Sequence, residues 1–293
     1  MTEELATTRS RRDSVPVPTT GSHSASPAEL AERARKRRRR QQGFVLGAQI
    51  AIAILLLAGM YLLNATSGNL TMPRPDDVLD ESIKMWSDGT MIRALGETMT
   101  VLTLGFILSA TTGVALGVLL GGFRIVGRVL DPFVNAMNST PGAAFIPLII
   151  VWFGLYTEAK VVVVWNAALF PILINTAAGI ANANKDLTEM ARAFGANRRN
   201  LFWSIMLPDA LPSILSGLRI GVAISTVGTV IAELTMAQSG LGGLLAQAGN
   251  RFQMDRYFAV VIVLMALGTA LSALLRFTEN RLARWRVAQA EGR

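Results

Sequence analysis

Six long apolar segments are the feature that most constrains what this chain can fold into. They cover approximately residues 43–63, 99–120, 133–153, 159–180, 211–232 and 257–277. Because a helix rises about 1.5 Å per residue, each segment is long enough to cross a hydrocarbon layer of about 30 Å. Backbone groups find no water in that layer, so each segment must satisfy its own hydrogen bonds as a helix. The sequence therefore predicts an all-α polytopic membrane protein with six transmembrane helices.

Composition agrees with this interpretation and removes several kinds of chemistry. The chain is 51% hydrophobic and has a mean hydropathy of +0.41, which is too apolar for an ordinary soluble domain. It has no cysteine, which excludes disulfides and thiolate sites. Its single histidine, His23, lies in a polar tail, so the apolar region offers no histidine for a metal or for catalysis. We expect no catalytic residue and no metal site in this chain.

The positive charge of the chain is concentrated in its N-terminal tail. Residues 1–41 carry ten Lys and Arg against five Asp and Glu, and large apolar residues are rare there. Such a segment cannot bury enough surface to offset the entropy of ordering, so we expect a disordered basic tail. The arginine-rich run at 35–40 directly precedes the first apolar segment. We interpret it as a topology anchor at anionic membrane lipid, because no aromatic or folded platform for nucleic acid accompanies it.

Charges in the short loops predict which side of the membrane each loop occupies. Basic residues mark the N-terminal tail, the second-to-third and fourth-to-fifth connections and the C-terminus, all of which fall on one side. Positive loops stay in the cytoplasm, so both termini are expected there, in a plasma-membrane protein. The predicted parts are the tail at 1–41, a first span with an external linker at 42–90, a core at 91–285 and a cytoplasmic tail at 286–293.

The loop between the fourth and fifth segments, residues 185–208, contains helix-capping, glycine and proline signals that a simple connection does not need. We call it the elbow. Asp186 with Glu189 forms a capping-box pattern that predicts a short helix over about 187–194. Gly195 should end this helix in the left-handed conformation. Asn197 should cap a second helix that ends before Pro208.

The spacing of the elbow resembles the cytoplasmic EAA loop of permease subunits of ATP-binding-cassette (ABC) importers. The matching residues are Glu189-x-Ala191, Gly195 and Ile205-x-Leu207-Pro208, and Met190 departs where alanine is usual. Other pieces of the chain are similar to the nitrate, taurine and aliphatic sulfonate permease family. These pieces are Arg128-Val-Leu-Asp-Pro132, Ser139-Thr-Pro141, Ile146-Pro147, Trp152-Phe-Gly154, Gly217-Leu-Arg-Ile220, Ala232-Glu233 and Gly240-Leu-Gly242.

This resemblance implies a Type I ABC importer permease fold and a translocation subunit that is not itself an enzyme. Its implied partners are a cytoplasmic ATPase dimer, an external substrate-binding protein and a second permease copy, within membrane lipid and without nucleic acid. ATP and Mg would bind the separate ATPase, and this chain would hold no cofactor. The implied solute is small and anionic, such as nitrate, a sulfonate or taurine. The residues assigned to ATPase coupling are Glu189, Ala191, Arg192, Gly195, Arg198, Leu207 and Pro208.

The sequence lacks the common phosphate-binding loop for ATP, as expected of a permease that works with a separate ATPase. A phosphate-binding loop of the G-x-x-x-x-G-K-[ST] type needs a lysine after glycine, and the four lysines follow Arg, Ile, Ala and Asn. The main alternative is a secondary transporter driven by an ion gradient. That class needs carboxylates deep in the membrane, whereas Glu97, Asp131 and Glu233 lie near the ends of spans. A membrane-embedded enzyme is disfavoured because no two spans offer matched catalytic groups.

Polar residues inside the spans are candidates for the translocation path or for ordinary helix packing. Arg219 either reaches the cytoplasmic surface or a structural ion pair, or it faces the path and favours anions. Glu233 is either a solvated acid at the membrane surface, next to a glycine-rich turn at 239–243, or part of an outer gate or receptor contact. Prolines 141, 147 and 171 should bend the third and fourth spans. The candidate path residues are Asn138, Ser139, Asn166, Arg219, Thr226 and Glu233.

Overall fold

A computed structural model describes residues 72–236 and 239–282, together with residues 47–65 except 50, 53 and 56. The predicted tails at 1–41 and 286–293 lie outside these residues. The chain divides into two units, residues 1–58 and 59–293. In the first unit the described residues are helical, as the first apolar segment predicts.

In the second unit every regular element of the described residues is helical, which confirms the predicted all-α class. The turn η1 (Gly142–Phe145) is a 3-10 helix and η2 (Phe202–Met206) is π-helical. The α-helices are α2 (Pro75–Ser87), α3 (Thr90–Gly122), α4 (Arg124–Ser139), α5 (Ile146–Phe153), α6 (Thr157–Ala181), α7 (Lys185–Ala193), α8 (Arg198–Leu201), α9 (Leu207–Met236), α10 (Gly240–Asn250) and α11 (Met254–Leu282).

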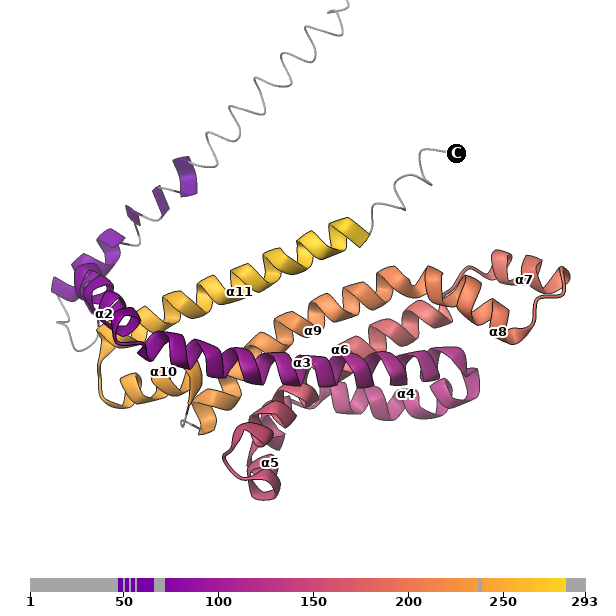
Figure 1. Ribbon diagram of the computed structural model, residues 1–293, viewed down its shortest axis with the longest axis horizontal. Helices are drawn as coiled ribbons and strands as arrows, with labels where there is room; N and C mark the ends of the chain where they lie inside the picture. The colour runs from indigo at the N-terminus through magenta and orange to yellow at the C-terminus, as the bar shows by residue number, and fades with distance from the viewer. Residues whose placement is uncertain are drawn as a thin grey trace, which may run out of the picture. The chain divides into compact units, whose positions relative to one another are not determined.

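The long helices α3, α6 and α9 run along one another, with α7 and α8 at one end of the bundle and α2 and α10 at the other (Figure 1). Among the described residues, four helices are long and apolar enough to cross a membrane. They are Thr90–Gly122, Thr157–Ala181, Arg198–Met236 and Met254–Leu275. They correspond to the predicted second, fourth, fifth and sixth spans.

The predicted third span is not one straight helix. Its two halves, Ile125–Ser139 and Gly142–Phe153, meet at an angle of 87°. Thr140 is extended at the break, as the residue before a proline tends to be, and Pro141 follows it. The bend expected from Pro141 is therefore confirmed, whereas α6 continues through Pro171 without a break.

A row of small residues lets α3 approach α6 closely. At Gly117 an added Cβ would lie 2.5 Å from the Cβ of Thr176 and 2.7 Å from the carbonyl oxygen of Leu173. No ordinary contact is that short, so this backbone approach requires glycine. The row recurs at every fourth residue of α3, which places its members on one face: Gly105, Ser109, Gly113, Gly117 and Gly121.

Helix α9 approaches α6 from another side in the same way. A Cβ added to Gly217 would lie 2.8 Å from the Cβ of Asn175, and one added to Gly221 would lie 2.6 Å from Ile172. On α6, a Cβ added to Gly179 would lie 2.7 Å from the Cβ of Ser213 on α9. Close contact between small residues is the usual means by which membrane helices associate. Helix α6 is thus the centre of a three-helix core.

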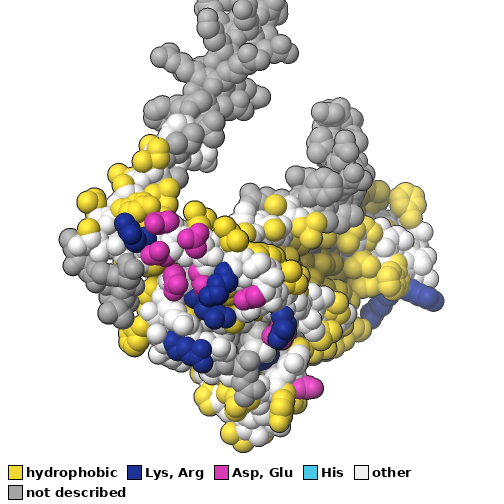
Figure 2. Space-filling model, turned by 60° about the vertical axis from the view of Figure 1, so that its left-hand side comes forward, with side chains coloured by type: hydrophobic (Ala, Val, Ile, Leu, Met, Phe, Trp, Pro, Cys, Tyr) yellow, Lys and Arg dark blue, Asp and Glu magenta, His cyan; other side chains and the backbone are white. Residues whose placement is uncertain are grey.

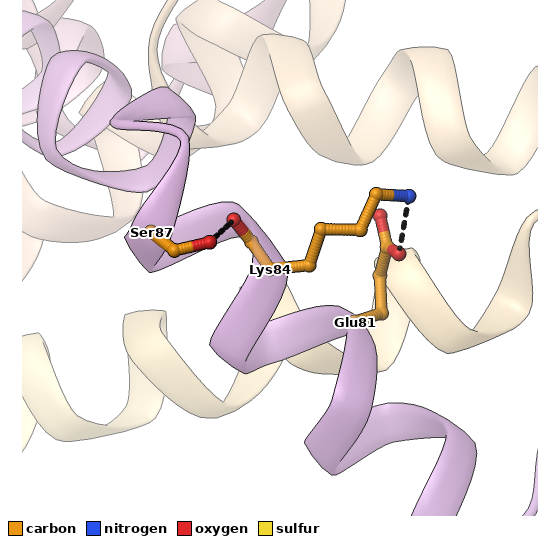
Figure 3. Close-up of polar contacts among 3 residues, drawn as sticks. All are labelled: Glu81, Lys84 and Ser87. Carbon is orange, nitrogen blue, oxygen red and sulfur yellow. Dashed lines mark hydrogen bonds and ion pairs between the residues drawn. The ribbon is translucent and has the colours of Figure 1, made fainter.

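Helix α2 was not predicted, because its residues were assigned to a linker. It begins at Pro75, which suits a first helical position, and it buries Val78 and Met85. The Lys84 ammonium lies 3.1 Å from Glu81, and Ser87 donates a hydrogen bond to the Lys84 carbonyl oxygen (Figure 3). Acidic and basic side chains gather on this end of the molecule (Figure 2). The segment is therefore an amphipathic helix with a charged surface.

The close approach of α3 to α6 can be tested by adding one carbon atom. We expect Gly117→Ala to destabilise the protein by about 1–3 kcal/mol, since the added Cβ overpacks the interface. The matched control is Gly96→Ala on the same helix, where an added Cβ meets nothing within 4 Å. Unfolding followed by circular dichroism in detergent measures both. Equal stability of the two variants would contradict the packing argument.

Candidate functional site

The elbow begins with a cap that differs from the predicted one. Helix α7 starts at Lys185, and the Asn184 side chain accepts a hydrogen bond from the amide of Leu187 at 3.2 Å. The predicted cap, Asp186, lies instead within the first turn, where its charge still favours the positive end of the helix. The amide of Asn184 donates to Asp209 at 2.9 Å, which ties the start of the elbow to the start of α9.

The turn at the centre of the elbow is as predicted. Gly195 has a φ of +81°, in the left-handed region that glycine adopts without steric cost. The amide of Ala196 donates to the Ala191 carbonyl at 3.0 Å, and the amide of Gly195 donates to the Arg192 carbonyl at 2.9 Å. This pair of bonds is a Schellman motif. The Asn197 side chain then caps α8 by accepting from the amide of Asn200 at 2.8 Å.

The second elbow helix does not end before Pro208, which corrects the prediction. It continues through η2 into α9, so that Arg198–Met236 is one helical rod of 39 residues. Proline lacks an amide hydrogen and its ring crowds the preceding turn of an α-helix. The π-helical turn immediately before Pro208 shifts the hydrogen-bond register and widens the helix there. The elbow is therefore continuous with the fifth span.

Helix α7 presents two different faces. Leu187, Met190 and Phe194 are spaced three and four residues apart, so they share one face, and they are 45%, 52% and 86% exposed. Glu189 and Arg192 lie on the other side, where they line a cavity of about 850 Å³ between the elbow and the ends of α3 and α6. Both faces are exposed, but one is apolar and the one toward the cavity is polar.

The remaining predicted coupling residues do not share one surface. Arg198 lines the same cavity as Glu189 and Arg192. Gly195 is exposed with open space around it, and Ala191 is half-buried. Leu207 and Pro208 are half-buried at the junction between η2 and α9. The seven residues form one continuous loop, within which they have different surroundings.

At the opposite end of the bundle, Glu233 is fully buried, and it is therefore not a solvated acid. The Thr98 hydroxyl lies 3.0 and 2.9 Å from the two carboxylate oxygens of Glu233. The amide of Gly242 donates to Glu233 Oε2 at 2.9 Å. A buried carboxylate needs such donors, because an unpaired charge in an apolar interior is costly.

The same carboxylate helps to hold the first turn of α10, whose residues were predicted as a glycine-rich turn. Three consecutive amides, at 240, 241 and 242, donate to Glu97 at 2.7 Å, Thr98 at 2.8 Å and Glu233 at 2.9 Å. These amides have no partner within their own helix, and negative groups are favourable at this end of a helix. Gly240 has a φ of +80° and no room for a Cβ beside Glu233. Helices α3 and α9 thus fix the start of α10.

Lys160 completes this group, and sequence analysis missed it. Its side chain is 1% exposed, and Nζ donates to the Ser239 hydroxyl at 2.5 Å. A lysine inside the apolar segment at 159–180 was the signal that could have identified it, since ionisable residues within membrane spans are rare and have specific partners. We refer to Glu97, Thr98, Lys160, Glu233 and Ser239 as the Glu233 cluster.

The other candidate path residues lie apart from the Glu233 cluster. Asn138 and Ser139 are exposed at the end of α4, and Asn166 is half-buried beside η1, where its side-chain oxygen would lie 3.5 Å from a Cβ added to Gly142. On α9, Thr226 is half-buried and Arg219 is exposed. Arg219, Thr226 and Glu233 recur at every seventh residue, so they lie along the same side of that helix.

The sequence of this chain matches a family of membrane transport proteins. Residues 113–284 match the family described as binding-protein-dependent transport system inner membrane component. The chain is 30% identical over 252 residues to the putative aliphatic sulfonates transport permease protein of Bacillus subtilis (strain 168), covering 86% of this chain and 90% of that protein. It is 28% identical over 266 residues to the nitrate import permease protein of Leptolyngbya laminosa, covering 84% and 95%.

A solved structure supports the fold. The MetNI methionine ABC transporter in an inward-facing conformation aligns with a TM-score of 0.56 and 22% identity, covering 66% of this chain and 94% of that chain. The chain therefore belongs to the binding-protein-dependent transport system inner membrane component family. It is the permease subunit of an ABC importer with the Type I fold. Family membership does not support the alternative of an ion-gradient-driven transporter.

The contribution of Thr98 to the Glu233 cluster can be tested with a nearly isosteric change. We expect Thr98→Val to lower the free energy of unfolding by about 1–3 kcal/mol, because Glu233 and the amide of Leu241 each lose a buried partner. The control is Thr100→Val, since the Thr100 hydroxyl is exposed and bonds within its own helix. Denaturant titration in detergent compares the variants. A loss no larger than that of the control would disprove the contribution.

Proposed function

We propose that this permease moves a small anionic solute inward by alternating access, driven by an ATPase dimer that docks on the apolar face of the elbow. The observation that carries the proposal is the combination of this exposed face on α7 with a continuous helix that begins just after the Gly195 turn and leads to the Glu233 cluster. ATP and Mg bind the ATPase subunits, and this chain supplies the path and the coupling.

The apolar face has the properties of a docking surface. Leu187, Met190 and Phe194 expose apolar side chains on a short helix outside the core. An amphipathic helix commonly binds a partner by placing such anchors in a groove. Met190, the departure from the usual loop pattern, suits this role because its flexible side chain adapts to the surface it meets. Glu189 and Arg192 then support the elbow from the cavity side and do not meet the ATPase directly.

Helix continuity supplies a means of transmission. The rod Arg198–Met236 has 39 residues, which corresponds to a length of roughly 58 Å at 1.5 Å per residue. Its far end carries Glu233, which bonds to α3 and α10. A displacement of α8, the first part of this rod, must therefore either move the far end of α9 or bend the rod. We assign the Glu233 cluster to the outer gate on this basis.

The proposal has further parts, which concern the assembly, the location and the solute. Two permease copies would place their paths about one axis above an ATPase dimer, and a loaded external binding protein would meet the end opposite the elbow. The positive loops support a plasma-membrane location with both termini in the cytoplasm. Two relatives named for aliphatic sulfonates and for nitrate suggest an anion. Arg219 is exposed on the side of α9 that also carries Thr226 and Glu233. We assign to it the role of favouring anions along the path.

The docking face can be separated from the cavity side by two substitutions on α7. We expect Met190→Asp to reduce recovery of a co-expressed ABC ATPase subunit about tenfold or more, because a charge at an apolar contact costs about 2 kcal/mol. Glu189→Gln, on the other side of the same helix, should leave recovery within about twofold. Affinity purification of the tagged permease from membranes measures both. If Glu189→Gln releases the ATPase and Met190→Asp retains it, the contact lies on the polar side and the assignment is wrong.

A further inference from the structure

The cavity behind the elbow has a basic end. Arg192, Arg198 and Arg199 line it, with Glu189 as the acidic residue among its lining side chains. Among the described residues, no carboxylate lies within ion-pair distance of these three guanidinium groups. Arginine stays charged at any physiological pH, and its planar group matches the oxygens of a phosphate. The basic end therefore suits a phosphate-bearing anion.

The other end of the cavity is apolar and extends along a membrane span. Val118 and Leu119, from the last turns of α3, contribute to its wall. Phe123 and Trp203 also line it, and each is 61% exposed. Tryptophan side chains such as Trp203 are enriched where a membrane meets water. Helix α3 ends at Gly122, so the apolar wall belongs to the span and the arginines lie beyond its end.

The order of apolar wall, aromatic border and basic end in the cavity matches a phospholipid, in which an acyl chain leads through the interfacial region to a phosphate. We propose that the cavity binds an anionic phospholipid of the leaflet next to the elbow, with its phosphate at the three arginines and an acyl chain along α3. A soluble phosphate would use the basic end alone and would leave the apolar wall uncovered. Basic pockets between membrane helices are known to take such headgroups. The proposal rests on the proposed function in one respect, which is that the elbow lies at the cytoplasmic surface.

Such a lipid leaves the docking face of the elbow free. The cavity receives Thr188, Glu189 and Arg192 from α7, whereas Leu187, Met190 and Phe194 are absent from its lining and are exposed. A bound lipid would brace α7 and η2 against the ends of α3 and α6. The lipid composition of the leaflet would thereby influence how firmly the elbow is held during each cycle.

The test measures lipid retention by the intact permease–ATPase complex. The complex is equilibrated in nanodiscs of phosphatidylcholine with phosphatidylglycerol at 7:3, extracted in detergent, and analysed by mass spectrometry for phosphatidylglycerol per permease. The test variant is Arg192→Gln/Arg198→Gln/Arg199→Gln. The control, Arg93→Gln/Arg251→Gln/Arg256→Gln, removes the same charge from the end of the bundle opposite the elbow. An attraction of the size known for basic residues at a membrane predicts about a fivefold loss of affinity for each arginine removed.

We expect retention to fall at least tenfold in the test variant and to stay within twofold of the wild type in the control. Retention equal to the wild type in the test variant, or an equal loss in the control, would overturn the proposal. Inorganic phosphate at millimolar concentration should not displace the lipid. If it does, the site recognises a soluble anion and the lipid assignment is overturned.

The docking variant distinguishes this proposal from the proposed function. Met190→Asp, purified without its ATPase if docking fails, should still retain phosphatidylglycerol, because its side chain lies on the opposite face of α7. If Met190→Asp retains both phosphatidylglycerol and its ATPase, the result would support the lipid site and contradict the docking face. Loss of lipid in Met190→Asp would show that the cavity is not an independent site, and the proposal would fail.

Discussion

The arrangement of this permease depends on the contact of α6 with α3 and α9 through small residues. Between helices in lipid the hydrophobic effect contributes little, because lipid chains are as apolar as the side chains they would replace. Association must come from many short van der Waals contacts, and these need backbones that approach closely. Glycine at positions such as Gly117 and Gly217 permits that approach. The three-helix core then fixes where the ends of each helix lie, and with them the elbow and the Glu233 cluster.

The two ends of the core carry polar groups of different character. At the elbow, charged side chains are exposed and the helix ends are capped locally by Asn184 and Asn197. At the Glu233 cluster, the polar groups are buried or half-buried and come from α3, α6, α9 and the start of α10. In a low-dielectric interior each of these bonds is strong, and each unpaired group is costly. The elbow can therefore meet new partners, whereas the cluster can open only by breaking several bonds together.

Sequence patterns predicted most of what depends on composition and local chemistry. Four of the six predicted spans, the left-handed Gly195 and the bend at Pro141 were found where expected. The errors arose where tertiary structure overrides a local rule. Asp186 matches a capping pattern but lies two residues too late, and Pro208 continues a helix because η2 makes room for it. Helix α10 begins among glycines because side chains from distant helices bind its amides.

The candidate site was predicted unevenly for a related reason. The spacing of the elbow identified the loop, but it could not show that Met190 and Glu189 lie on opposite faces with different surroundings. The sequence did not predict the role of Lys160, because its partner, Ser239, is far away along the chain. The row of small residues from Gly105 to Gly121 was visible in the sequence, yet its meaning depends on which helix it meets.

The π-helical turn η2 sets the direction in which the elbow points. A π-turn holds one more residue in its hydrogen-bonded ring than an α-turn does. Successive residues of an α-helix are about 100° apart around the axis, so if Phe202–Met206 were α-helical with the same number of residues, everything before it would be rotated by about that angle relative to α9. The apolar face of α7 would then be aimed elsewhere with its composition unchanged. The hydrogen-bond pattern of a single turn therefore sets the direction of the apolar face of α7, independently of which residues form that face.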